Sequence, residues 1–93
     1  MASYKLSNNA AKSIGKIYEY SLLNFGEKQA DKYYQSLHHA FKLLAEEPHI
    51  GRKFHEYHRH EHGEHVFFYK ITNYGIKIIH IFHNREDIEN KIQ

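Results

Sequence analysis

Cysteine is absent from the 93-residue chain, and its absence excludes disulfides, thiolate zinc sites and cysteine nucleophiles together. No apolar run approaches the roughly 20 residues that cross a bilayer, and the N-terminus lacks the basic-then-apolar layout of a signal peptide. The sequence also lacks a Gly-x-Ser-x-Gly elbow and a glycine-rich phosphate loop. We therefore expect a cytoplasmic protein without a membrane segment, a conventional hydrolase site or a nucleotide-binding loop.

The composition that remains is that of a small globular domain. Hydrophobic residues make up 41% and charged residues 26% of the chain, which is ordinary globular usage and argues against disorder. The length leaves room for one domain over residues 1–93 and excludes a multidomain enzyme. The formal net charge of +2 is too balanced for a non-specific nucleic-acid binder, so local charge matters more than the sum.

Two amphipathic helices are predicted in the first half of the chain. A short extended segment over residues 4–6 precedes Ser7 or Asn8, either of which can cap a helix. Apolar residues then recur at three- and four-residue spacing up to Phe25, and the pattern resumes after Gly26. Proline disfavours helical geometry in the residue before it, so Pro48 ends the second helix. The two helices are expected to form an antiparallel hairpin.

The second half of the chain changes to the period of a strand. Residues 66–72 and 76–82 are rich in β-branched and aromatic side chains, and residues 73–75 between them form a turn with an available glycine. Residues 54–62 predict a more polar edge strand, and residues 85–93 a short helix or tail. The predicted fold is α+β, with an N-terminal strand and a helical hairpin packed on one face of an antiparallel sheet.

Both faces of the central strands are apolar, although one helical layer covers only one face. Strict alternation groups Val66, Phe68, Ile76, Ile78 and Phe82 on one face, and Phe67, Tyr69, Ile79 and Ile81 on the other. An uncovered apolar face marks a partner site. The alternative is that the first helix and the C-terminal tail wrap round to cover it.

Histidines are concentrated in the polar edge strand. They are His55, His58, His60, His62 and His65. Alternate residues of a strand share a face but lie about 6.6 Å apart, so three in a row do not converge on one ion without bending. We predict neither a metal site nor a cofactor.

Acid-base cleavage of RNA requires only a base, an acid and cationic groups around a phosphate. The candidates for this chemistry are Arg59, His60, His65, His80, His83 and Arg85. Among them, His83 and Arg85 directly follow the last apolar strand, where a strand end presents side chains to a partner.

Taken in order, segments across nearly the whole chain resemble the ParE toxins of the ParE/RelE superfamily. The matching residues are Leu6-Ser7, Ile17-Tyr18, Phe25-Gly26, Gln29-Ala30, residues 43–46, Pro48, residues 50–52, residues 57–60, residues 63–69 and residues 78–87. The resemblance implies a RelE-like fold and a type II toxin held inactive by a ParD-like antitoxin. ParE-like members inhibit DNA gyrase, whereas RelE-like relatives cut messenger RNA on the ribosome.

The end of the last strand favours the ParE branch, because no tyrosine follows Tyr74. The resemblance then implies an inhibitor of gyrase and not an enzyme, with operator DNA bound only through the antitoxin. We expect target contacts at Arg59, His83, Arg85 and Asp87. We expect antitoxin contacts on the apolar face at Phe68, Ile76, Ile78 and Phe82. If the chain is instead a ribosome-dependent endoribonuclease, its catalytic residues are expected to be Arg59, His65, His83 and Arg85.

Overall fold

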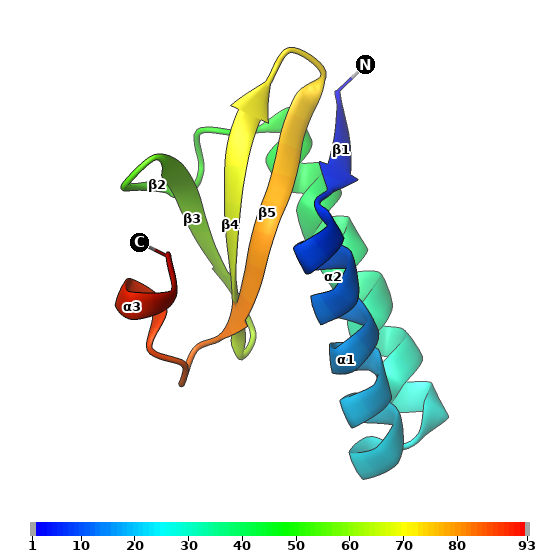
Figure 1. The fold of residues 1–93 in the computed structure, drawn as a ribbon. Helices are drawn as coiled ribbons and strands as arrows, with labels where there is room; N and C mark the ends of the chain where they lie inside the picture. The colour runs from blue at the N-terminus through cyan, green and yellow to red at the C-terminus, as the bar shows by residue number, and fades with distance from the viewer. Residues whose placement is uncertain (1, 93) are drawn as a thin grey trace.

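A computed structural model describes residues 2–92, in which two long helices lie against one face of a five-stranded sheet (Figure 1). The elements in chain order are β1 (Ser3–Leu6), α1 (Asn8–Phe25), α2 (Glu27–Glu46), β2 (Arg52–Phe54), β3 (Tyr57–His62), β4 (His65–Thr72), β5 (Gly75–His83) and α3 (Ile88–Ile92). The strands are ordered β1-β5-β4-β3-β2. The predicted α+β architecture is confirmed.

The helical hairpin begins and ends where the sequence predicts. Ser7 caps α1, because its Oγ accepts a hydrogen bond from the Ala10 N–H at 3.0 Å. Gly26 joins the two helices with a φ of 88°, a left-handed conformation that glycine adopts without steric cost. The second helix, α2, ends at Glu46, two residues before Pro48.

The sheet is mixed, because β1 pairs in parallel with β5 while β2 to β5 pair antiparallel, as expected. Gly75 allows this parallel contact, since a Cβ atom there would lie 1.9 Å from the Ser3 carbonyl oxygen. The polar strand predicted over residues 54–62 is shorter, as β3 (Tyr57–His62), and an additional short strand, β2 (Arg52–Phe54), forms where a loop was expected. His55 turns the chain between them with a φ of 55°.

The main core lies between the helical hairpin and the sheet. Phe41, Leu37 and Leu44 of α2 pack there against buried side chains of β4 and β5. Phe41 and Phe67 meet edge to face with ring centroids 4.7 Å apart, a favourable arrangement for aromatic pairs. This layer fixes the sheet on the hairpin and leaves the opposite sheet face, here called the outer face, without a long helix.

A β-bulge at Ile79 corrects the predicted division of the strand faces. Phe68 pairs with His80, but the next residue, Tyr69, pairs with Ile78, so Ile79 is the extra residue. Because one inserted residue reverses the alternation, Ile76 and Ile78 point toward the helices.

The outer face carries a second, smaller core built around Phe68. Ile88 and Ile92 of α3 pack against Phe68, Val66 and Tyr57. The C-terminal segment therefore covers this face, as the alternative expected, whereas α1 packs in the main core. Phe68 is consequently 0% exposed, as Ile76 and Ile78 are beneath the helices. The expectation that these three residues form an accessible antitoxin surface is therefore wrong, and only Phe82 of that set is partly exposed.

Candidate functional site

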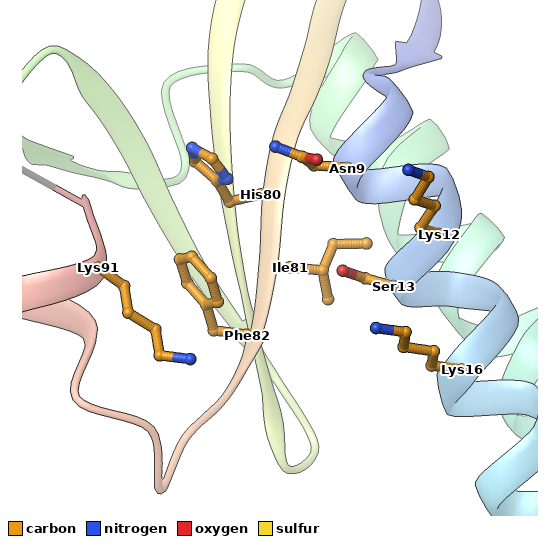
Figure 2. Close-up of a pocket in the computed structure, with 8 residues that line it drawn as sticks. All are labelled: Asn9, Lys12, Ser13, Lys16, His80, Ile81, Phe82 and Lys91. Carbon is orange, nitrogen blue, oxygen red and sulfur yellow. The ribbon is translucent and has the colours of Figure 1, made fainter.

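A groove runs over the open edge of the second half of β5, with α1 on one side and α3 on the other (Figure 2). It exists because β1 pairs only with Gly75 to Ile78, after which Ser7 turns the chain into α1. Within residues 2–92, no strand lies beside the rest of β5 on that side. The groove has a volume of about 360 Å³ and is lined by Asn9, Lys12, Ser13 and Lys16 of α1, His80, Ile81 and Phe82 of β5, and Lys91 of α3. We refer to it as the β5 groove.

The wall of the β5 groove is cationic and its floor is mostly apolar. Lys12 and Lys16 lie one helical turn apart on α1, and no carboxylate is among the lining side chains. Lys91 on the opposite side is held by Glu86 at 2.6 Å. On the floor, the rings of His80 and Phe82 stack with centroids 5.3 Å apart. Burial lowers the pKa of His80 and so favours its uncharged form. An open strand edge beside lysines suits an anionic, extended chain.

The end of the sheet nearest α3 brings two predicted histidines together. His65 and His83 are register partners on β4 and β5, with ring centroids 5.4 Å apart. The Tyr33 hydroxyl of α2 bonds to Nδ1 of His65 at 2.7 Å. Burial, and then the neighbouring His83, lower the pKa of His65. Both effects favour the uncharged form of the His65 imidazole.

The turn after β5 is fixed by local hydrogen bonds. The His83 N–H donates to the Glu86 carboxylate at 2.7 Å, and the Arg85 N–H donates to Nδ1 of His83 at 3.1 Å. Arg85 and Asp87 are exposed in this turn, and the Asp87 carboxylate accepts from the Asn90 amide at 2.6 Å. The turn therefore presents one cation and one anion on a defined backbone.

Arg59 and His65, two of the predicted catalytic residues, lie on opposite faces of the sheet. The Arg59 guanidinium lies over the rings of Phe54 and Phe68 on the outer face, at 5.4 and 5.8 Å from their centroids. His65, by contrast, bonds to Tyr33 on the helix side. The set of Arg59, His65, His83 and Arg85 is thus not assembled around one point.

The histidine cluster of β3 packs against aromatic side chains. His58 stacks on Tyr69 and His62 on Phe67, with centroids 5.6 and 5.7 Å apart. Burial lowers the pKa of His58, of His60 and of His62. In the part of the chain from residue 2 to 92, no three histidine or carboxylate side chains are placed to hold a metal ion.

The end of α1 carries an exposed apolar patch that sequence reasoning missed. The patch, called the hairpin tip, consists of Tyr20, Leu22, Leu23 and Phe25, which are 63, 39, 78 and 64% exposed. Figure 1 shows the two helices extending beyond the sheet at this end. The adjacent leucines were a usable signal, because neighbouring residues of a helix cannot both face the core. Among the helices described, none is long and apolar enough to span a membrane.

The fold is shared with a solved toxin–antitoxin structure. One chain of the chromosomal ParDE TA system from P. aeruginosa matches with a TM-score of 0.74 at 21% identity, over 89% of this chain and 96% of that one. The protein thus has the architecture of a small α+β chain found in such systems.

The sequence comparisons define the family. Residues 4–88 match the model of the ParE toxin of the type II toxin–antitoxin system parDE. Toxin ParE1 of Mycobacterium tuberculosis (strain H37Rv) is 31% identical over 96% of both chains, and Toxin ParE1 of Caulobacter vibrioides is 31% identical over 89% of this chain and 90% of that one. The chain therefore belongs to the ParE toxin family of type II toxin–antitoxin systems.

Proposed function

We propose that this toxin inhibits bacterial DNA gyrase in the cytoplasm and that a ParD-like antitoxin neutralises it. Family membership supports the toxin assignment, and the structural likeness to a chain of a ParDE system supports a ParD-type partner. The observation that favours inhibition by binding over catalysis is the separation of Arg59 from His65 by the sheet. Operator DNA would be bound through the antitoxin.

The antitoxin is proposed to occupy the β5 groove. The floor contains Phe82, the one accessible member of the predicted antitoxin surface, and the open edge of β5 offers backbone groups to an added strand. The wall carries Lys12 and Lys16, which favour an acidic segment. An acidic strand in this groove would therefore combine main-chain hydrogen bonds with charge pairing.

A matched pair of double variants tests this assignment. Lys12→Glu with Lys16→Glu reverses the groove wall and is expected to weaken binding of the antitoxin encoded beside the toxin gene by at least about tenfold, since like-charge juxtaposition is costly. Lys28→Glu with Lys32→Glu makes the same change at the same spacing on α2. Equal affinity of the two variants, measured by calorimetry, would place the antitoxin elsewhere.

The target contacts are proposed at the turn after β5, with Arg85 and Asp87 as its exposed charges and His83 as the residue that fixes its backbone. Arg59 on the outer face is the fourth predicted contact. Residues at the ends of a rigid sheet are well placed for this role, because the scaffold holds them in a defined position. Substitution of Arg85 or Asp87 by Ala is expected to relieve toxicity while antitoxin binding persists.

The Tyr33, His65 and His83 group supports a second candidate, ribosome-dependent cleavage of messenger RNA, because it pairs a hydroxyl with an imidazole whose uncharged form is favoured. Induction of the toxin in bacterial cells separates the two functions. Gyrase inhibition predicts plasmid DNA with protein-linked double-strand breaks and intact messenger RNA. New messenger RNA ends within minutes, abolished by His65→Gln, would favour the nuclease.

A further inference from the structure

Three lysines form a straight row across three strands of the sheet. Lys5 of β1 pairs in register with Lys77 of β5, and Lys77 pairs in register with Lys70 of β4. Register partners share a face, and Ile76 and Ile78 on either side of Lys77 point toward the helices. The three side chains therefore lie on the outer face, and all three are exposed. We call them the lysine row.

This arrangement is unfavourable in the free protein. Like charges directly opposite each other on neighbouring strands repel, and Lys77 has one such neighbour on each side. Within residues 2–92, only Lys70 of the row has a carboxylate partner, Glu56 at 3.0 Å. Repulsion that the fold leaves uncompensated is relieved when an anion binds across the row.

We propose that the lysine row binds the phosphate backbone of duplex DNA. Neighbouring strands are about 4.8 Å apart, so the row places three cations along a line of about 10 Å on an open sheet surface. A duplex presents closely spaced phosphates at this scale, and lysine contacts to phosphate position a protein on DNA without reading its sequence. The small net charge of the whole chain does not oppose this, because the cations are concentrated in one place.

The surrounding aromatic residues favour a duplex over a single strand. Single-stranded nucleic acids bind through bases stacked on exposed aromatic rings. Tyr57 and Phe68 of the outer face are buried, at 9 and 0% exposure, and Lys5 lies 4.9 Å from the Tyr74 ring centroid. Tyr74 is half-buried and its ring is occupied by a lysine of the row, so it is not a free stacking surface. This inference goes beyond the proposed function, since inhibition of gyrase through protein contacts alone requires no DNA contact by the toxin.

Fluorescence anisotropy with a labelled 20-base-pair DNA duplex tests the proposal on the full chain, purified free of antitoxin. With three phosphate contacts, the logarithm of the association constant is expected to fall with the logarithm of the salt concentration with a slope of about −2.7. This slope corresponds to about a 40-fold loss of affinity between 50 and 200 mM NaCl. The variant Lys5→Gln/Lys70→Gln/Lys77→Gln is expected to remove this binding. The matched variant Lys28→Gln/Lys32→Gln/Lys42→Gln loses the same charge from α2 and should bind like the parent chain.

Equal losses in the two triple variants would overturn the proposal, because binding would then follow net charge alone. It would also fail if the parent chain did not bind at 50 mM NaCl, or if duplex RNA or a poly-glutamate peptide bound more tightly than DNA. Should the row variant not fold by circular dichroism, Lys77→Gln alone is expected to reduce the slope by about one. A chain that inhibits gyrase but fails this binding test would refute the DNA contact and leave the proposed function standing.

Discussion

Tyr69 is the most informative single residue for the stability of this fold. It is 0% exposed, and its hydroxyl donates to the Pro48 carbonyl at 2.7 Å and accepts from the Gly51 N–H at 3.1 Å. These bonds tie the loop after α2 to the centre of the sheet. Only glycine leaves room for this contact at position 51, because a Cβ atom there would lie 2.3 Å from the Tyr69 hydroxyl oxygen.

Tyr69→Phe removes the hydroxyl and leaves the partly buried Gly51 N–H and Pro48 carbonyl without their partner. A single unsatisfied buried group costs about 1–3 kcal/mol, so the free energy of unfolding is expected to fall by about 2–3 kcal/mol. For a domain of this size each kcal/mol shifts the Tm by roughly 4–8 °C, which predicts a loss of roughly 8–24 °C. The loss in Tm is measured by thermal unfolding monitored by circular dichroism.

Tyr34→Phe is the matched control, because Tyr34 is 41% exposed on α2. Its expected effect is within about 0.5 kcal/mol, as for other surface substitutions. A Tm for Tyr69→Phe within 2–3 °C of the parent, roughly the shift of 0.5 kcal/mol, would refute the role given to this hydroxyl. A large loss in both variants would point to a general effect of removing phenolic oxygens.

Two further predictions concern acid stability and α3. Burial lowers the pKa of His58, His62 and His65 in the folded chain. The unfolded chain therefore binds more protons than the folded chain as the pH falls below about 6.5, and stability falls with it. The urea midpoint should be lower at pH 5.5 than at pH 7.5, and an unchanged or higher midpoint would contradict this. Ile88→Ser with Ile92→Ser should release α3, lower stability by about 2–4 kcal/mol and increase binding of an apolar dye to the outer face, whereas unchanged dye binding would show that α3 does not cover it.

The two long helices and the two apolar strands were predictable because the sequence signals for them are local. The capping residue Ser7 and the stop at Pro48 each act within a few residues, and the three- and four-residue spacing marked the helix, although Ala11 and Phe25 at the ends of that stripe are exposed. The parallel pairing of β1 with β5 was not predictable in the same way. It depends on contact between Ser3 and Gly75, which lie far apart along the chain.

The candidate site was less predictable, since it depends on which face each side chain occupies. One extra residue, Ile79, reversed the faces of Ile76 and Ile78, and nothing in a run of apolar residues marks where a bulge falls. The cover over Phe68 did have a signal. Ile88 and Ile92 are spaced four residues apart in a charged segment, as expected for a short amphipathic helix.

A supercoiling assay with purified gyrase is the sharpest test of the proposal that this ParE-family toxin acts on DNA gyrase. The chain is added after separation from its antitoxin, and Arg85→Ala serves as the folded comparison. Gyrase inhibition predicts lost supercoiling with accumulation of cleaved DNA, reversed by prior addition of antitoxin and weakened in the variant. Normal supercoiling at toxin concentrations that arrest growth would contradict the proposal.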